Sequence, residues 1–243
     1  MPVAPPKVSR IRLAPEHRFG RLVGSLLVAI VVASGLAAPA VLAGNLDSGT
    51  LPRRDLLERA LAAYRRVDQA GLLRTRLLTV IDYSIPSSQR RLWVVEPASR
   101  KVLFHEFVAH GSGSATEENP ELAVQFGNEE SSRRSSLGTF LTGDTYTGKH
   151  GHSLRLLGLD PGVNDKALER QIVIHPADYV SAEFRATQGG RVGRSLGCPA
   201  LDPAVAPAII DCIRDGSVLY VAGAAVAPAE PLASAARSAS RGR

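Results

Sequence analysis

Two residues of this chain have the chemistry of a nucleophile and its base, Cys198 and His175. His175 ends a short apolar run that starts at Ile172, a pattern that predicts a strand whose end is a rigid mount for an imidazole. Cys198 follows a glycine- and arginine-rich turn over residues 193–197. Because a thiolate is strongly nucleophilic and its thioester stays reactive, such a pair suits acyl transfer.

The local sequence around Cys198 favours this chemistry over a structural role. A buried histidine and a core cysteine at this spacing would be common, but here three glycines and two arginines precede Gly-Cys-Pro. Gly197 permits a tight turn that leaves backbone N–H groups near the thiol free for an oxyanion. We expect the imidazole, with Arg191 and Arg194, to lower the pKa of the thiol.

Apolar periodicity predicts the elements that position this pair. Residues 45–79 read as a helical segment in which Thr50 caps the first turn and Gly71 ends the helix; its apolar face is Leu57, Ala60, Leu61, Tyr64 and Val67. Short runs of β-formers follow. Residues 91–96 and 101–109 flank a proline turn and predict a hairpin.

Further strands are expected at residues 137–142, 153–159, 171–175 and 217–222. Residues 112–134 lack periodicity, as a long functional or disordered loop does. After the cysteine, the sequence predicts a helix that Asp202 caps, that starts at Pro203 and ends near Ile213, and that Pro207 kinks.

The other cysteine and the remaining histidines are not interpreted as catalytic residues. Pairing of Cys198 with Cys212 is disfavoured, because a helix from Pro203 places Cys212 about 13 Å from its start and a disulfide needs Cα atoms within about 7 Å. Cys212 is therefore expected in the core. His150 and His152 lack an accompanying acidic or cysteine ligand, so both are expected to be loop or surface histidines and no metal site is predicted. His110, beside a flexible glycine, is expected to line the cleft.

The first 43 residues have the pattern of a leader. Five basic residues precede an apolar run that ends in small residues, as in a signal peptide; an uncleaved N-terminal anchor is the alternative. Either predicts export, to the periplasm or cell envelope, with membrane contact only through an uncleaved leader. Without the leader the chain has 24 basic and 22 acidic residues, a net charge of +2 rather than +6, which does not indicate a nucleic-acid partner.

Several stretches together resemble the murein L,D-transpeptidase catalytic-domain family. The segment Gly-Arg-Ser-Leu-Gly-Cys-Pro-Ala at residues 193–200, preceded by Ile-Val-Ile-His at 172–175, resembles that family's active-site region. The resemblance extends over roughly residues 50–222, through the motifs at 80–93, 108–111, 135–140 and 146–151.

The resemblance implies a mainly β (α+β) fold, a small β-sandwich with an N-terminal helical segment and one helix after the cysteine. It divides the chain into a leader (1–43), a helical segment (44–79), a catalytic domain (80–223) and a disordered tail (224–243).

It also implies a reaction. Cys198 would attack the meso-diaminopimelate carbonyl of a peptidoglycan tetrapeptide, release D-Ala, and pass the acyl group to an amine. His175 would be the base, oriented by the backbone of Ser195 to Gly197. Carbapenems would acylate the thiol, and no cofactor is implied.

Four further residues are predicted to contact substrate. Leu196 stands where the wider superfamily has a second histidine, and Arg194 replaces the arginine that the superfamily carries after its cysteine, so that it would grip a substrate carboxylate. Tyr179 and His110 complete the set.

Three other functions remain open at this point. Water in place of the amine would make the protein an L,D-carboxypeptidase or endopeptidase. A non-catalytic peptidoglycan-binding domain could keep the fold, although both Cys198 and His175 are present. A papain-like peptidase is disfavoured because there the cysteine precedes the histidine.

Overall fold

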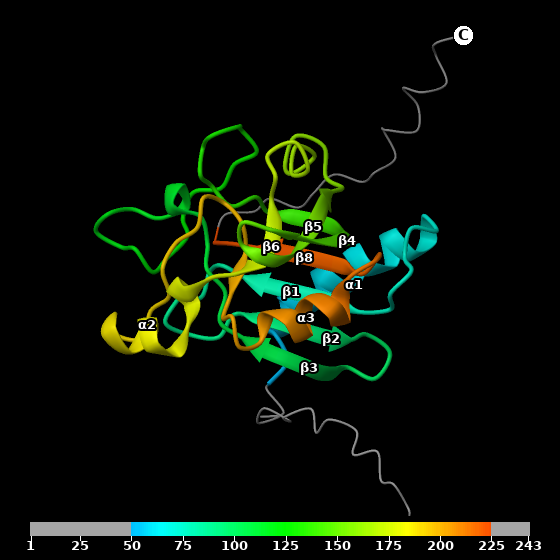
Figure 1. The fold of residues 1–243 in the computed structure, drawn as a ribbon. Coiled ribbons are helices and arrows are strands. Elements are labelled where there is room, and N and C mark those ends of the chain that lie inside the picture. The colour runs from blue at the N-terminus through cyan, green and yellow to red at the C-terminus, as the bar shows by residue number, and fades with distance from the viewer. Residues whose placement is uncertain (1–49, 225–243) are drawn as a thin grey trace, which may run out of the picture. The chain divides into compact units, whose positions relative to one another are not determined.

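A computed structural model describes residues 50–224, and in this part of the chain the fold is mainly β (Figure 1). Eight strands form one sheet in the order β3-β2-β1-β8-β4-β5-β6-β7. Their bounds are β1 Leu78–Asp82, β2 Leu92–Glu96, β3 Lys101–Glu106, β4 Gly138–Gly148, β5 Gly151–Gly158, β6 Val173–Pro176, β7 Ala200–Leu201 and β8 Val218–Ala222. The predicted leader and tail lie outside the described residues.

The sheet is almost closed on itself. β1 pairs with β8 in parallel and β6 with β7 in parallel, and the other neighbours are antiparallel. At the ends of the sheet, the chain beyond β3 reaches β7, where the Ala109 amide donates to the Ala200 carbonyl at 2.9 Å. The mainly β fold predicted from the sequence is therefore confirmed, with one rolled sheet supplying both layers.

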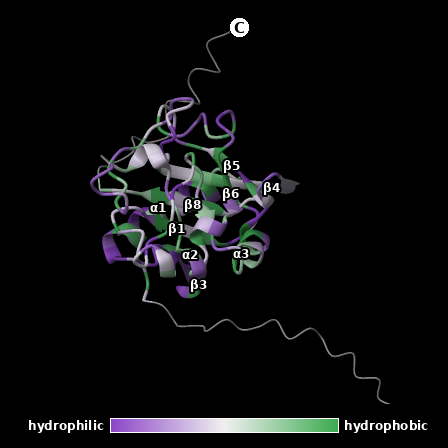
Figure 2. Ribbon diagram, turned by 60° about the vertical axis from the view of Figure 1, so that its left-hand side comes forward, coloured by the Kyte–Doolittle hydropathy of each residue, from purple (hydrophilic) through white to green (hydrophobic). Residues whose placement is uncertain are grey.

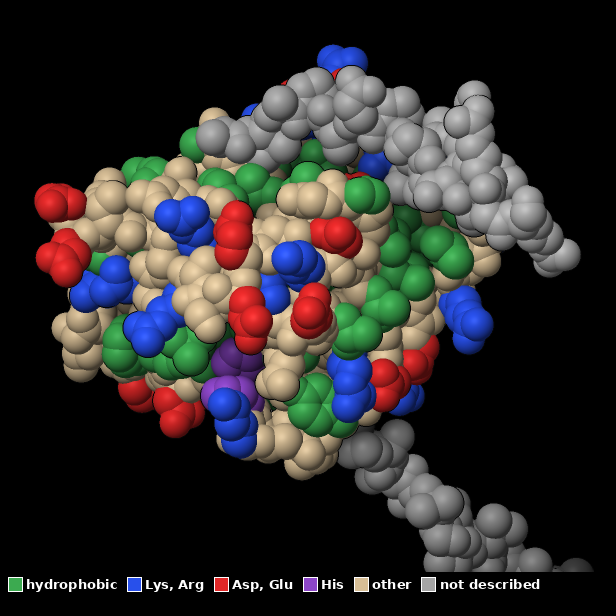
Figure 3. Space-filling model, turned by 90° about the horizontal axis from the view of Figure 1, so that it is seen from above, with side chains coloured by type: hydrophobic (Ala, Val, Ile, Leu, Met, Phe, Trp, Pro, Cys, Tyr) green, Lys and Arg blue, Asp and Glu red, His purple; other side chains and the backbone are tan. Residues whose placement is uncertain are grey.

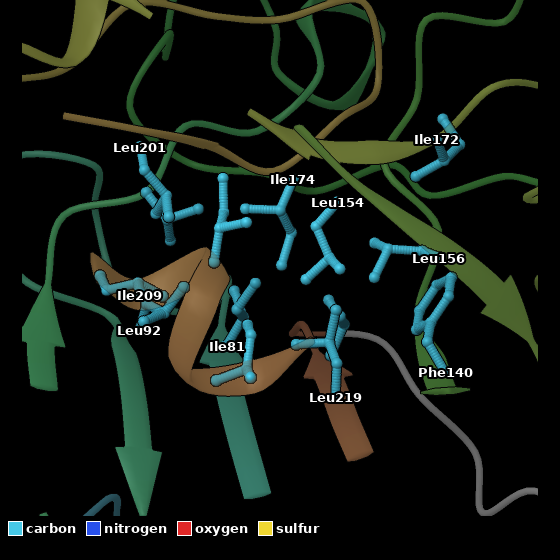
Figure 4. Packing of buried hydrophobic residues seen from close by; sticks show 14 of the residues in the cluster. Ile81, Leu92, Phe140, Leu154, Leu156, Ile172, Ile174, Leu201, Ile209 and Leu219 are labelled. Atoms are coloured by element: carbon cyan, nitrogen blue, oxygen red, sulfur yellow. The ribbon is translucent and has the colours of Figure 1, made fainter. Parts of the chain in front are cut away.

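The main core lies inside this rolled sheet. Ile81 of β1 and Leu92 of β2 belong to the same buried cluster as Leu154 of β5 and Ile174 of β6, so opposite parts of the sheet meet (Figure 4). Many strand segments in the middle of the molecule are hydrophobic, whereas many of the loops around them are hydrophilic (Figure 2). Since the cluster includes Ile174, the residue before His175, core packing holds the strand that carries His175.

Helix α1 (Arg54–Gln69) covers the other face of the sheet. Leu56, Ala60, Tyr64 and Val67 pack against side chains of β1 and β8, including Val80, whose neighbour Ile81 faces the main core. This alternation follows from the two-residue period of a strand. The helical segment thus packs on the domain.

The helix is shorter than the segment predicted at residues 45–79. It begins after Arg53 rather than at a Thr50 cap, and Arg53 makes no side-chain cap bond. It ends as predicted just before Gly71, which has a φ of +70°. Residues 78 and 79 already belong to β1, because they pair with β2 and β8.

Helix α3 (Ala206–Ile213) also starts later than predicted. Asp202 does accept from the Ala204 amide, but residues 203–205 form a turn and the N-cap is Val205. The predicted kink at Pro207 is wrong, because Pro207 lies in the first turn, where an amide has no helical acceptor to lose. Ile209 anchors the helix on the core (Figure 4).

The predicted hairpin is confirmed as β2 and β3. β4 runs six residues further than predicted, to Gly148, and forms a long hairpin with β5 whose tip is Lys149–His150. The two-residue β7 and the short helices η2 (Asp178–Val180) and α2 (Ala182–Thr187) were not predicted. Residues 112–134 contain only the short helix η1 (Ser112–Ser114).

Within the described residues no helix is long and apolar enough to cross a membrane.

Candidate active site

A tight turn holds Cys198 two residues before β7. The Ser195 hydroxyl accepts from the Gly197 amide at 3.0 Å and donates to the Cys198 carbonyl at 2.6 Å. Gly197 has a φ of +128°, and an added Cβ would lie 3.0 Å from the Arg134 carbonyl. Only glycine fits such a conformation at such close range. Ser195 and Gly197 therefore shape the turn that presents the thiol.

The thiol itself lies against the segment that leads into β6. The Val173 amide donates to Sγ at 3.5 Å, and the S–H group donates to the Gln171 carbonyl at 3.6 Å. Burial raises the pKa of the Cys198 thiol, although the Val173 amide, Arg170 and Lys149 act in the opposite direction. The expectation of a lowered pKa is therefore wrong, because desolvation of the thiolate outweighs the nearby charges.

His175 lies on β6 and is 3% exposed. Its Nδ1 is 2.9 Å from the Pro176 carbonyl, which can only accept, so Nδ1 carries the proton and Nε2 is the free base. The bond that orients the imidazole thus comes from Pro176 and not, as expected, from the backbone of residues 195–197.

Strand pairing brings the two residues together. β6 and β7 are parallel with His175 opposite Ala200, the His175 amide donates to the Pro199 carbonyl at 3.4 Å, and the Val173 amide contacts the thiol, so the segment that carries Cys198 lies beside the strand that carries His175. The thiol proton is directed to the Gln171 carbonyl rather than to the imidazole. The resting site therefore holds a neutral thiol beside a neutral base, not a preformed ion pair.

The tip of the β4–β5 hairpin lies over the imidazole of His175. The His150 ring stacks on the His175 ring with centroids 4.4 Å apart and planes 29° apart. Burial lowers the pKa of His175; the Pro176 bond raises it, and His150 and Lys149 lower it again. His150 was predicted to be a surface histidine, and its contact with His175 was missed. The signal was its place in the motif at 146–151.

The predicted substrate residues divide into accessible and buried ones. Arg194 and Leu196 are exposed on the turn, and Leu196 is 68% exposed. Tyr179 packs on the turn, where its carbonyl accepts from the Gly193 amide at 2.7 Å. Burial first, then Cys198, raises the pKa of the Tyr179 phenol, which indicates that the phenol is close to the thiol.

His110 does not line the cleft, because it is fully buried. Arg91, also fully buried, donates to His110 Nδ1 at 2.8 Å and to the Val108 carbonyl, and the His110 carbonyl accepts from the Ser195 amide at 2.9 Å. Burial, together with Arg91 and Arg194, lowers the pKa of His110 to about 3. This histidine supports the Cys198 turn from beneath.

Arg170 lies close to Cys198, and nothing in its sequence context predicts this. It lies in a turn before β6 and reaches across to residues 127–136, where its guanidinium donates to the Gly127 and Arg134 carbonyls and to the Ser132 and Ser136 hydroxyls. One side chain thus ties the long loop to the strand that carries the base, and brings a positive charge near Cys198.

Within the described residues no three His, Cys, Asp or Glu side chains gather as a metal site would require. In the same part of the chain Cys198 and Cys212 are both free thiols.

Comparison with known families identifies the domain. Residues 51–222 match the family described as "L,D-transpeptidase catalytic domain", which covers well over half of the chain. The chain belongs to this family. The match includes helix α1, Cys198 and His175, so the helical segment is part of the L,D-transpeptidase domain.

Solved structures that resemble the chain are distant. They include an L,D-transpeptidase from Mycobacterium smegmatis, with 16% identity, 60% of this chain and 58% of that chain covered, and a TM-score of 0.36. L,D-transpeptidase 1 from Mycobacterium tuberculosis has 15% identity, 60% and 62% coverage and a TM-score of 0.34. An L,D-transpeptidase in complex with imipenem has 15% identity, 60% and 58% coverage and a TM-score of 0.36.

The chain therefore spans about 60% of the length of these structures. No curated protein matches it.

Proposed function

We propose that the protein is a peptidoglycan L,D-transpeptidase in which Cys198 is the nucleophile. The observation that supports this most directly is that Cys198 lies in the turn that leads into β7, whose parallel partner β6 carries His175, with the imidazole tautomer fixed by Pro176. Family membership supports the reaction class. The substrate proposed is a stem peptide whose third residue is meso-diaminopimelate.

Acylation begins with proton transfer from the thiol to Nε2 of His175. The sulfur then bonds to the carbonyl carbon of the third residue, and the oxyanion is stabilised by amides of the turn at Cys198 other than those of Ser195 and Gly197, which already donate within the protein. When the carbon–nitrogen bond breaks, the imidazolium returns the proton to the leaving amine of D-Ala. The product is a thioester on Cys198.

Transfer reverses these roles. An acceptor amine attacks the thioester and gives its proton to His175, and the imidazolium protonates the departing thiolate. Because the resting thiol is neutral, His175 acts as a general base in the first step and not as one half of an ion pair.

The first test is acylation by a carbapenem, followed by intact mass. We expect one covalent adduct on the wild type, none on Cys198→Ala, and the same adduct on Cys212→Ala, which removes the other thiol. An adduct that survives in Cys198→Ala, or no adduct on a wild type that titrates two ordinary thiols, would contradict the assignment.

The second test uses a tetrapeptide muropeptide as donor, with and without a second stem as acceptor. Release of D-Ala together with a cross-linked product supports transfer. Release of D-Ala with only a free tripeptide would show that water is the acceptor.

We also propose that the domain acts outside the cytoplasm. The support is the basic and apolar sequence of residues 1–43. Fractionation of cells that produce the full chain tests this, and recovery of the protein in the cytoplasmic fraction would contradict it.

A further inference from the structure

The tip of the β4–β5 hairpin carries a positive charge that none of the steps above uses. Lys149 and His150 form this tip, between Gly148 and Gly151, which pair with each other in β4 and β5. The Lys149 side chain is exposed, and within residues 50–224 it makes no hydrogen bond or ion pair. Its ammonium is therefore available to a ligand.

Contacts with two aromatic rings hold the tip in place. The His150 ring stacks on the His175 ring, with centroids 4.4 Å apart. The Tyr146 ring packs on Gly148, where an added Cβ would lie 2.8 Å from the nearest ring atom. The backbone of Lys149 lies between these two contacts in the chain, so its position beside the catalytic imidazole is fixed.

The charge of Lys149 acts on both members of the catalytic pair. Burial raises the pKa of Cys198 and lowers that of His175, and in both cases the positive charge of Lys149 has an additional lowering effect. Because an electrostatic effect falls with distance, the ammonium lies near both groups. Figure 3 shows a face on which histidine side chains lie directly beside a basic side chain.

The reaction brings an amine to this position in each of its two halves. The leaving amine takes its proton from His175 and the acceptor amine gives one to it, so each amine must come within hydrogen-bond distance of the imidazole. In an α-amino acid the carboxylate is bonded to the same carbon atom as the amine. A leaving D-Ala therefore places a carboxylate close to the imidazole, where the ammonium of Lys149 is available.

Two other cations of the site are less suited to this carboxylate. The Arg170 guanidinium already donates to four acceptors of the neighbouring loop. Arg194 is exposed on the turn before the cysteine, and its charge contributes, after burial, to the lowered pKa of the buried His110. The groups that shift the pKa of His175 include Lys149 but not Arg194.

We propose that Lys149 recognises the amine partner of the reaction: its ammonium binds the carboxylate of the leaving D-Ala during acylation, and the carboxylate of an α-amino acid acceptor during transfer. This inference rests on the proposed function and adds a specificity-determining residue to it. A donor with a free carboxylate on its leaving residue is preferred over one with a carboxamide there, because an ammonium binds a charged acceptor more strongly than a neutral one.

The first measurement compares two tetrapeptide donors that differ only in the leaving residue, which is D-Ala or its carboxamide. Release of this residue is measured as kcat/KM. For the wild type we expect the free acid to be preferred by on the order of five-fold, as an ion pair open to solvent provides, and the preference should decrease as salt is added.

Lys149→Gln should remove this preference, and Lys149→Arg, which keeps the charge, should retain most of it. Each preference is a ratio within one variant at one pH, so a changed pKa of His175 affects both donors alike. Lys101→Gln makes the same change to an exposed lysine at the start of β3 and should keep both rate and preference. Thermal unfolding of each variant shows that it is folded.

The second measurement concerns the acceptor. Since acylation is reversible, labelled D-Ala added to the donor should be incorporated into the tetrapeptide, and labelled D-alaninamide less so. Lys149→Gln should lower the ratio of the two incorporated labels towards one.

Two results would overturn the inference while leaving the proposed function intact: a wild type that uses both donors equally, or Lys149→Gln that keeps the preference. Loss of the preference in Arg194→Gln instead would assign the carboxylate to the turn. A wild type that releases nothing from either donor and forms no carbapenem adduct would overturn both the inference and the proposed function.

Discussion

At the scale of single residues, the notable feature is that His175 is kept neutral by its surroundings. Burial is the main cause of its lowered pKa, and the positive charges of Lys149 and His150 add to it. An imidazole with a lowered pKa stays unprotonated in mildly acidic solution. Acylation should therefore persist at pH values below the ordinary histidine pKa of about 6.5.

The substitution His150→Phe separates the effect of the charge on His150 from the effect of its ring stacking on His175. The phenyl ring can still stack on His175 but cannot carry a positive charge, so the pKa of His175 should rise. The acid limb of the rate of carbapenem acylation, measured against pH, should therefore move to higher pH. His152→Gln is the control, because His152 pairs with Asp211 and not with the site. An unmoved limb in His150→Phe would show that only packing connects the two rings.

The Cys198–His175 pair could be predicted because its signal is local: a glycine-rich turn before a cysteine and an apolar run that ends in histidine. The pKa of the thiol could not, since it depends on desolvation by residues far away in sequence. For the same reason His110 was misplaced. A histidine next to a glycine resembles a cleft residue until its burial against Arg91 is known.

At the scale of elements, Arg170 connects the loop of residues 112–134 to the strand that carries the base. Its guanidinium has four hydrogen-bond acceptors in residues 127–136. The sequence of this loop has no apolar periodicity that would predict a helix or strand. The sequence predicts a loop here but not its attachment, which depends on a contact across more than 30 residues.

Arg170→Met should release this loop while keeping much of the side-chain volume. We expect limited proteolysis within residues 112–134 to become at least several-fold faster, and acylation of Cys198 to slow, because a nearby positive charge is lost. Arg191→Met is the control, since that side chain donates only to Gln188 nearby. Equal cleavage of both variants and the wild type would mean that the loop is held by other contacts.

The elements that were predicted correctly are those with a clear apolar pattern in the sequence, such as α1 and the β2–β3 hairpin. The errors fall where tertiary pairing decides. β7 has only two residues and exists because it pairs with β6, and β4 extends because β5 pairs with it as far as Gly151. The sequence pattern predicts a kink at Pro207 because it places the start of the helix at Pro203, three residues before its actual start at Ala206.

At the scale of the whole molecule, the near-closed sheet is supported by a buried polar group. Arg91 and His110 lie where the chain beyond β3 approaches β7, and neither is exposed. In the fold the pKa of His110 is about 3, whereas in the unfolded chain it has its ordinary value of 6.5. The unfolded state therefore takes up a proton between these two values and the folded state does not.

The contribution of His110 to the free energy of unfolding should therefore be fully present above pH 6.5 and decrease as the pH falls towards 3. The slope of this decrease should approach about 1.4 kcal/mol per pH unit. Urea unfolding at a series of pH values measures this. His110→Gln keeps an acceptor for Arg91 but has no proton to gain, so the slope should decrease in that variant. An unchanged slope would assign acid sensitivity to other groups.

The protonated state of the buried thiol has a further consequence for the life of the enzyme. Oxidants and stray disulfides attack thiolates, and a thiol with a raised pKa presents little thiolate to them. For a protein exported as proposed above, the raised pKa of the thiol would therefore slow its inactivation by oxidation.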